Sequence, residues 1–318
     1  MLKEKFYYLI LYALVLLLSF SLVGFLSDIF WFFDLFNHFR PQAVVCGFIL
    51  LLASIYLKDK KTISIALIIL IINVSAIGER LYTFPVVEKS EIISASSEKK
   101  ENISFIFSNV LTSNNNYQAF FQMIDKNSPD VLVLAEVNDQ WLSEIHSNLS
   151  FPFYIEDPRQ DNFGMAIFSN KPFKSIIYNV GEYKLPLIVA EFEDFVVIAI
   201  HPIPPVGKEQ TKEIHTYMMK IAILSQQIQK PLILTGDFNS TLWSKSMTYL
   251  ENLDLKRANK LGLAWTWPSG FFPLAVQIDH LFMRGISNAT FETLPDIGSD
   301  HFPIMSKIVL NKNNKVER

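Results

Sequence analysis

Residues 232–240 read LILTGDFNS, and this stretch decides the fold. Its apolar part is too short for a typical helix and ends in glycine, which predicts a buried strand over Pro231–Asp237. The polar residues Asp237 and Asn239 come where this strand ends. Side chains that leave a packed sheet at the ends of its strands converge on a rim. The stretch therefore predicts a sheet that carries a polar site at one rim.

Polar residues follow other apolar runs of the chain in the same way. They are Asn109 after FIFS, Glu136 after VLVLA, His201 after VVIAI, Asp279 and His280 in QIDHLF, and Asp300 and His301 in GSDHFP. Each one alone is more commonly a turn residue, a helix cap or an ordinary histidine. Together, these carboxylates, amides and imidazoles form a set of hard ligands suited to Mg²⁺ or Mn²⁺ rather than a thiolate zinc site.

From Ile103 onward, short apolar runs alternate with longer amphipathic ones, which is typical of an α/β or α+β sandwich rather than a helical bundle. The middle of this region has strand patterns without helices between them, which predicts an antiparallel component. We expect further strands at Ile103–Val110, Asp130–Val137, Phe163–Ser169, Leu187–Phe192 and Phe195–His201, and helices at Tyr117–Lys126 and Gln210–Gln229.

The first 89 residues are dominated by Leu, Ile, Phe and Val and account for the positive mean hydropathy of the chain, +0.25. Three apolar runs, Phe6–Leu26, Ala43–Leu57 and Ile63–Gly78, can cross a hydrocarbon core of about 30 Å once helical residues at their ends are included. A cleavable signal peptide is the alternative for the first run, but that run is longer than a usual signal core and two more follow. We expect three transmembrane helices.

Lysines set the expected orientation of these helices, because they precede the first span and fill the short loop between the second and the third. They are Lys3, Lys5, Lys58, Lys60 and Lys61. The loop 27–42 has Arg40 as its fixed cation and aromatic residues suited to the outer interface. We therefore expect a multi-pass protein of the inner or plasma membrane, with everything after Gly78 on the extracytoplasmic side.

Charge and cysteine content exclude several classes of protein. Residues 90–318 contain 20 basic and 25 acidic side chains, a formal charge of −5, which is not the basic footprint of a nucleic-acid-binding domain. The hydrophobic content of 50% excludes intrinsic disorder. The single cysteine, Cys46, excludes an intrachain disulfide and a Cys-based zinc site.

The order Asn109, Glu136, His201, GDFN, IDH and SDH resembles the endonuclease/exonuclease/phosphatase superfamily of metal-dependent phosphoesterases. GDFNS followed by QIDHLF and GSDHFP is a specific signal in combination, and the resemblance covers roughly Ile103–Leu310. It implies an α+β fold, a four-layer αββα sandwich with its site at one end of two packed sheets. Here the sandwich would be preceded by the three transmembrane helices.

The resemblance also implies a metal site. Glu136 would be the main ligand of a divalent cation, Mg²⁺ or Mn²⁺, because a hard carboxylate can fix the ion against a phosphate oxygen. Asn109 would help to position metal and phosphate, and Asp300 would be a further carboxylate near the metal.

The resemblance gives the remaining residues catalytic roles. Asp237 and Asn239 would orient the attacking water and the scissile phosphate. His301 would be the catalytic histidine, with Asp279 as the carboxylate that fixes its tautomer, and His201 would donate to the phosphoryl oxygens. Whether Asp237 or His301 takes the proton from water stays open.

Three segments near these residues have more specific interpretations. The prolines of HPIPP, 201–205, stiffen the chain beside its histidine and would shape the substrate mouth. The segment AWTWPSGFFPLAVQ, 264–277, is either core packing or an apolar lip for a lipid-linked substrate. In RQDNFGMAIFS, 159–169, Asp161 and Asn162 either support the histidine or cap a turn.

We divide the chain into a membrane domain, 1–80, a linker, 81–101, and a catalytic domain, 102–312. The fold alone does not select a substrate, because the superfamily acts on DNA, inositol phosphates, sphingomyelin and isoprenoid pyrophosphates. Three N-terminal spans joined to this domain resemble the VanJ-type membrane proteins linked to glycopeptide resistance. That resemblance implies a phosphatase for undecaprenyl pyrophosphate or a similar lipid phosphate.

We therefore expect a membrane-anchored, metal-dependent phosphoesterase that hydrolyses an extracytoplasmic, lipid-linked phosphoester or pyrophosphate. One alternative is a surface or periplasmic metal-dependent endonuclease or exonuclease, for which the nearby cations are Lys171, Lys174, Lys184 and Lys208. Another is a catalytically inactive binding protein that keeps the sandwich.

Overall fold

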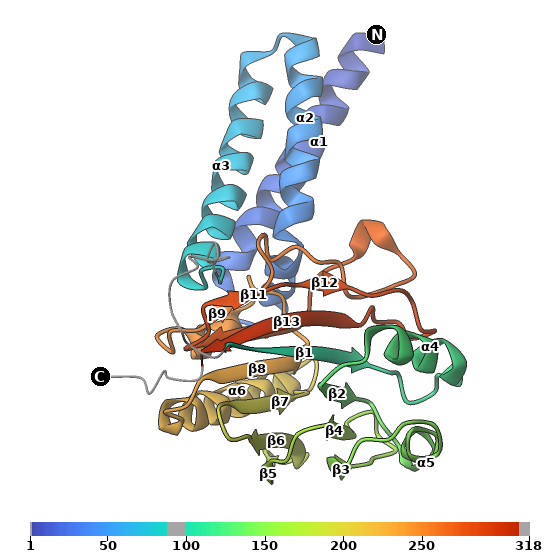
Figure 1. Ribbon diagram of the computed structural model, residues 1–318. Coiled ribbons are helices and arrows are strands. Elements are labelled where there is room, and N and C mark those ends of the chain that lie inside the picture. The colour runs from blue at the N-terminus through green and yellow to red at the C-terminus, as the bar shows by residue number, and fades with distance from the viewer. Residues whose placement is uncertain (1, 88–99, 312–318) are drawn as a thin grey trace.

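Three long helices stand on one side of a layered sandwich (Figure 1). The computed structural model describes residues 2–87 and 100–311, so most of the expected linker, 81–101, lies outside the described residues. The helices are α1, Leu2–Val23, α2, Arg40–Leu57, and α3, Lys60–Thr83. They are long and apolar enough to cross a membrane, as the sequence predicts.

The lysine-containing ends of the three helices lie together, away from the sandwich (Figure 1). The chain enters at the far end of α1, descends to the sandwich, returns along α2 and descends again along α3 (Figure 1). Lys3 and Lys58 line one shallow depression at the far end, whereas the segment between α1 and α2 lies at the sandwich. This segment, expected as a loop, contains two 3₁₀ helices, η1 at Gly24–Leu26 and η2 at Trp31–Phe39.

Two mixed sheets form the sandwich. One has the strand order β11-β13-β1-β2-β4-β3 with β12 beside β13, and the other has the order β5-β6-β7-β8-β10-β9. The pairs β1–β2 and β7–β8 are parallel and the other pairs are antiparallel, which confirms the expected antiparallel component.

The strands and the helices of the sandwich have the following bounds. They are β1 Lys100–Asn109, α4 Tyr117–Asn127, β2 Val131–Ala135, α5 Asp139–Asn148, β3 Phe153–Asp157, β4 Met165–Ser169, β5 Lys174–Val180, β6 Leu185–Glu191, β7 Val196–Ile200, α6 Lys208–Gln227, β8 Leu232–Asp237, η3 Lys245–Leu250, β9 Lys256–Arg257, η4 Phe272–Leu274, β10 Asp279–Arg284, β11 Asn288–Ala289, β12 Glu292–Thr293 and β13 Ile304–Asn311.

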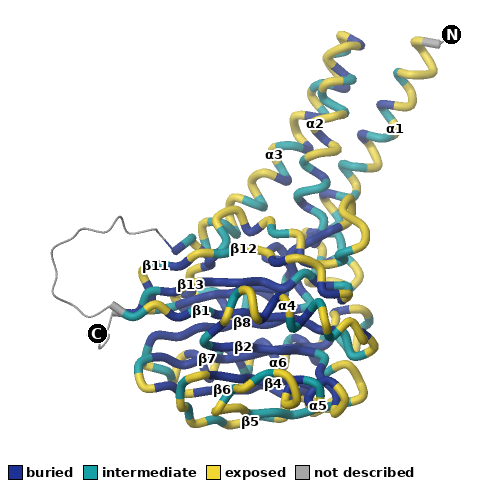
Figure 2. Tube along the Cα trace, turned by 45° about the vertical axis from the view of Figure 1, so that its right-hand side comes forward, coloured by how far each residue is buried: buried dark blue, intermediate teal, exposed yellow. Residues whose placement is uncertain are grey.

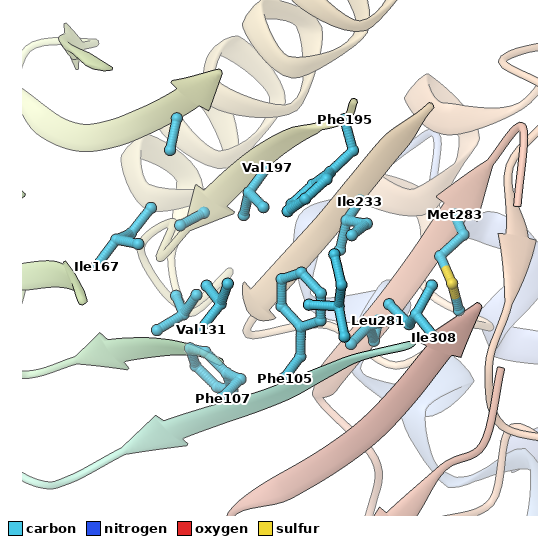
Figure 3. Packing of buried hydrophobic residues seen from close by; sticks show 14 of the residues in the cluster. Phe105, Phe107, Val131, Ile167, Phe195, Val197, Ile233, Leu281, Met283 and Ile308 are labelled. Atoms are coloured by element: carbon cyan, nitrogen blue, oxygen red, sulfur yellow. The ribbon is translucent and has the colours of Figure 1, made fainter. Parts of the chain in front are cut away.

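Alternation along the strands builds four layers, because successive side chains of a strand point to opposite faces. In β1, Phe105 and Phe107 pack between the two sheets, while Ile106 packs against α4 and α5 (Figure 3). In β8, Ile233 lies in the same central core, while Leu234 packs against α6. The central strands of both sheets are therefore buried on two faces, whereas the edge strands β3 and β5 are partly exposed (Figure 2). The four-layer αββα sandwich is confirmed.

Buried polar contacts attach the helices to the sandwich. Asp34 of η2 accepts hydrogen bonds from Ser244 Oγ at 2.7 Å and from the Lys245 N–H at 2.9 Å. At the end of α3, the Arg257 side chain donates to the carbonyl oxygens of Leu81 and Phe84. Because these groups are paired across the junction, helices and sandwich form one packed unit.

Replacing Asp34 with alanine is expected to destabilise the protein by about 1–3 kcal/mol, because Ser244 and the Lys245 N–H lose their buried acceptor. Thermal unfolding of the purified protein in detergent measures this effect. The matched control is Asp28→Ala, since the Asp28 carboxylate is 71% exposed and pairs only with the Lys245 ammonium group at 2.6 Å. That exposed ion pair is worth about 0–1 kcal/mol. Equal losses in the two variants would contradict the structural role of Asp34.

Candidate active site

The strand register brings the predicted polar residues to one end of the two sheets. Asp237 at the end of β8 lies directly opposite Asp279 at the start of β10. In the other sheet, Asn109 at the end of β1 pairs with the residue before Glu136. His301 lies in the chain that leads into β13, which is antiparallel to β1 and therefore begins at the same end.

Two backbone features hold this end of the sandwich in place. Gly236 has a φ of +155°, and a Cβ there would lie 2.0 Å from the carbonyl oxygen of Ile200, so glycine lets β8 lie close to β7. Glu136 has a φ of +61°, a left-handed conformation that costs a non-glycine residue about 1–3 kcal/mol. Hydrogen bonds from Asn109 and Thr112 hold its carboxylate in this position.

His301 and Asp279 form a buried pair. The Nδ1 of His301 lies 3.0 and 3.1 Å from the two carboxylate oxygens of Asp279. Burial lowers the pKa of His301, but the charges of Asp279 and Asp237 outweigh it and raise the pKa to about 10. The imidazole is therefore protonated at neutral pH.

Asp237 lies between the two histidines. Its Oδ2 is 3.5 Å from His201 Nε2 and 3.6 Å from His301 Nε2, and its Oδ1 accepts the Asn239 N–H at 2.7 Å. Burial raises the pKa of Asp237 to about 7 against the opposing charge of His301. Burial and the charge of His301 lower the pKa of His201 to about 3, so this imidazole is neutral.

Glu136 and Asn109 form the other half of the site. Asn109 Nδ2 donates to Glu136 Oε1 at 2.8 Å and to Asp237 Oδ2 at 3.2 Å, so the amide joins the two sheets. Burial raises the pKa of Glu136, and the Asn109 hydrogen bond opposes this shift. Asp300 lies close enough for its charge to act on Glu136. Asp300 Oδ2 accepts the Trp267 indole N–H at 3.0 Å, while its buried Oδ1 has no hydrogen-bond partner among the residues that the structure describes.

Other predicted residues have more local roles. Asn239 adopts a left-handed conformation, φ +48°, and its Nδ2 donates to the Pro202 carbonyl at 2.8 Å, which ties the proline loop to the site. His280 points away from the site and hydrogen-bonds the Ser240 carbonyl at 2.9 Å. Asp161 pairs with Arg159 and accepts the Phe163 N–H, which favours the turn interpretation over support of His201.

A pocket of about 540 Å³ has a wall that the sequence did not reveal. Its predicted polar lining residues, which we call the polar floor of the pocket, are Glu136, His201, Asp237, Asn239, Asp300 and His301. This wall comes from η2, whose Leu35, His38 and Phe39 line the pocket. The His38 ring is fixed through Nδ1, which accepts the Thr241 N–H at 3.4 Å. The prolines of the expected substrate mouth, Pro204 and Pro205, also line the pocket, together with Val206, Val276 and Ile278. The apolar lining residues form the mouth of the pocket, and this mouth includes Leu35 and Phe39 from the segment between α1 and α2.

Core packing is the wrong interpretation for the tip of the aromatic segment. Phe271 and Phe272 are 54% and 62% exposed, and Trp265 is also exposed. Trp267 lies at the pocket and its indole holds Asp300. Thr266 and the end of the segment from Ala275 onward are buried.

The residues fit a divalent cation. Four carboxylates line the pocket, and among the described lining residues there is no lysine or arginine that could attract a phosphate. Carboxylate and amide oxygens suit Mg²⁺ or Mn²⁺, and a cation would also supply the partner that Asp300 Oδ1 lacks.

Two groupings of these ligands could hold the cation. Asp237, Asp279 and His301 offer atoms within 4.8 Å of one another, but His301 Nδ1 is already paired with Asp279. The Glu136 and Asp300 carboxylates are hydrogen-bonded to neutral donors, the Asn109 amide and the Trp267 indole. Because Asp279 is instead paired directly with His301, Glu136 and Asp300 are the better candidates.

Comparisons with known proteins agree with this architecture. The model of the endonuclease/exonuclease/phosphatase family matches residues 102–301, from β1 to His301. No curated protein matches the sequence.

Several solved structures share the fold. Truncated Caenorhabditis elegans TDP2 is 17% identical with a TM-score of 0.51, covering 66% of this chain and 98% of that one. D. rerio TDP2 complexed with a single-stranded DNA product is 17% identical with a TM-score of 0.53, covering 65% and 99%. A family protein from Bacteroides thetaiotaomicron is 17% identical with a TM-score of 0.50, covering 70% and 100%. At these identities the likeness concerns the fold alone.

Proposed function

The chain belongs to the endonuclease/exonuclease/phosphatase family, and from this premise we propose that it is a membrane-anchored, metal-dependent phosphoesterase of extracytoplasmic, lipid-linked phosphoesters or pyrophosphates. Residues 1–80 would be the anchor and residues 102–312 the catalytic domain. One observation carries the proposal. The pocket that holds Glu136, Asp237 and His301 is also lined by Leu35 and Phe39, which come from the segment between α1 and α2.

The cation would be Mg²⁺ or Mn²⁺, held by Glu136 with Asn109 and Asp300. When bound, it would neutralise negative charge on the phosphoryl oxygens and so favour attack by water. Asn109 keeps the Glu136 carboxylate oriented through its 2.8 Å hydrogen bond. The oxygen of Asp300 that lacks a partner is the group we assign as a further ligand.

The sequence leaves open which residue activates water. The pKa shifts of Asp237 and His301 support one assignment. Asp237, with a pKa raised to about 7, can accept a proton near neutral pH. His301, with a pKa raised to about 10, carries a proton that it can donate to the phosphoryl or leaving oxygen. We therefore assign Asp237 as the base and His301, oriented by Asp279, as the charged donor. His201 is neutral and would donate a hydrogen bond to a phosphoryl oxygen.

Neutral His201 and partly buried Asn239 restrict the position of the phosphate. Asn239 is fixed by its hydrogen bond to Pro202, and His201 by the contact of its backbone N–H with the Tyr217 hydroxyl at 3.3 Å. Because catalysis of phosphoryl transfer consists mainly of positioning and charge stabilisation, these fixed donors support the assignment.

The purified full-length protein in detergent tests the activity. With Mg²⁺ it is expected to release phosphate from a polyprenyl pyrophosphate, the substrate class implied by the resemblance to VanJ-type proteins. A chelator should abolish this release and added Mg²⁺ or Mn²⁺ should restore it. Activity that is unchanged by chelator would refute the metal-dependent mechanism.

A surface or periplasmic nuclease is the second candidate, because one structure of the same fold, D. rerio TDP2, was solved with a DNA product. The pocket gives this candidate less support, since no lysine or arginine lies among its described lining residues. Lys171, one of the cations nominated for DNA contact, is paired with Glu101. Single-stranded DNA in the same assay separates the two: hydrolysis of DNA without release of phosphate from lipid would favour the nuclease.

We also propose that the N-terminus is cytoplasmic and the catalytic domain extracytoplasmic. The lysines at the far end of the helices support this orientation (Figure 1). A C-terminal alkaline phosphatase fusion is expected to be active, and a C-terminal green fluorescent protein fusion exported through Sec is expected to be dark. The reverse pattern would place the catalytic domain in the cytoplasm.

A further inference from the structure

Residues 261–278, which we call the aromatic loop, connect β9 to β10 and contain no charged side chain over 18 positions. The loop nevertheless lies at the surface: Phe272 is 62% exposed and Leu274 is 50% exposed. Contiguous exposed apolar residues mark a surface that contacts another apolar phase. The feature is not explained by catalysis, because neither Phe272 nor Leu274 lines the pocket.

The position of the aromatic loop indicates that the apolar phase it contacts is the membrane. Gln42, in the first turn of α2, donates through Nε2 to the Ala275 carbonyl at 2.9 Å. At the start of the loop, Gly262 lies beside Leu81 of α3. The orange chain between β9 and β10 accordingly lies on the side of the sandwich that carries the helices (Figure 1). The loop is therefore level with the ends of α2 and α3, where a bilayer crossed by these helices would end.

The side chains of the aromatic loop match the chemistry of that boundary. Trp265 and Trp267 combine an apolar ring with an N–H group, and tryptophan is enriched at the junction of head groups and hydrocarbon. Exposed Ile29 and Phe30, between η1 and η2, form a second apolar tip beside the same helix ends. The membrane helices also expose apolar side chains, among them Val45 on α2 and Ile71 on α3.

We propose that the aromatic loop inserts into the outer leaflet of the bilayer that the helices cross, so that the pocket opens at the lipid surface. The proposal rests on the membrane anchoring of the proposed function but not on its chemistry. Trp267 and Val276 border the pocket, so the inserted loop connects the leaflet to the active site. A substrate would then keep its hydrocarbon chain among the lipids while its phosphoryl group reaches the polar floor.

Depth-dependent fluorescence quenching tests this insertion. In a Cys46→Ser background, a cysteine at position 272 carries an environment-sensitive label, and the full chain is reconstituted into lipid nanodiscs. Lipids spin-labelled close to the head group are expected to quench this label by about half or more, as for a residue buried a few ångströms below the surface. Leu274→Cys is a second position on the same loop and is expected to behave alike.

Two matched positions make the result decisive. Native Cys46 is exposed on α2 and should be quenched if the helices cross the bilayer. Ile176 on β5 is 56% exposed on the part of the sandwich away from the helices, and Ile176→Cys should not be quenched (Figure 1). A quenched Cys46 label with positions 272 and 274 as unquenched as position 176 would overturn the insertion alone. An unquenched Cys46 label would overturn the anchoring. Disulfide formation between the unlabelled cysteines at position 272 of two chains would assign the loop to a second copy.

Discussion

His301→Ala is expected to lower kcat by about 10³-fold, with a change in KM of only a few-fold. The imidazolium faces Asp237 at 3.6 Å and is held by Asp279 through Nδ1, so its removal takes away the one protonated donor of the polar floor. The charge that develops on the phosphoryl and leaving oxygens is then no longer stabilised. Phosphate release by the purified full-length variant at saturating Mg²⁺ measures the loss.

The matched control is His215→Ala, because His215 lies half-buried on α6, outside the pocket. This variant is expected to keep wild-type turnover. The pH profile gives a second readout, since the pKa of His301 is raised to about 10 and protonated His301 is the active form. Wild-type activity should therefore fall as the pH rises through about 10, and this decline should be absent from the residual activity of His301→Ala. Wild-type turnover in His301→Ala would contradict the role of His301 as the charged donor.

The polar floor could be predicted from the sequence because its residues stand at one end or the other of an apolar strand pattern: Asp237 ends β8, whereas Asp279 begins β10 and His301 precedes β13. Strand ends of a sheet converge whatever the rest of the chain does, so Asp237 and Asp279 were expected to meet, and they lie opposite each other in register. The strands β1, β2, β4, β6, β7 and β8 and the helices α4 and α6 match predicted elements, since their periodicity is local. The helix α5 and the strands β3, β5, β10 and β13 are not among the predicted elements. The two-residue strands β9, β11 and β12 are too short to show any period.

The apolar wall of the pocket could not be predicted, because it depends on contacts between distant residues. Asp34 reaches Ser244 across 210 positions of sequence, and no local pattern indicates that pair. Leu35 and Phe39 have the same composition as an ordinary interfacial belt, which is how the loop 27–42 was interpreted. Only the packing of η2 on the sandwich shows that these residues line the catalytic pocket.

The aromatic segment illustrates a second limit of sequence patterns. Its composition suits burial in a protein core and burial in a membrane equally well, because both environments are apolar. The structure separates the two parts of the segment: Ala275 and Val276 are buried and Phe271 and Phe272 are exposed. Composition shows that these side chains prefer an apolar environment. It does not show whether the protein core or the membrane provides that environment.

Glu136→Gln is expected to lower activity by about 10²–10³-fold at moderate Mg²⁺ and to raise the Mg²⁺ concentration needed for half-maximal rate. Glutamine keeps the shape of the side chain and can still accept the hydrogen bond from Asn109 Nδ2. The variant therefore removes a negative charge with little change in packing, and a cation loses the carboxylate we assign as its main ligand. Titration of the rate with Mg²⁺ in wild type and variant measures the shift.

Glu213→Gln is the control, because Glu213 is also a buried glutamate but accepts the Glu182 N–H at 2.9 Å on α6, outside the pocket. Its Mg²⁺ titration should match that of the wild type. The alternative grouping of Asp237, Asp279 and His301 makes the opposite prediction. If Asp279→Asn raises the Mg²⁺ requirement and Glu136→Gln leaves it unchanged, the cation lies between Asp237 and Asp279. In that case His301 and the cation would compete for the Asp279 carboxylate, and this competition would determine the charge of His301.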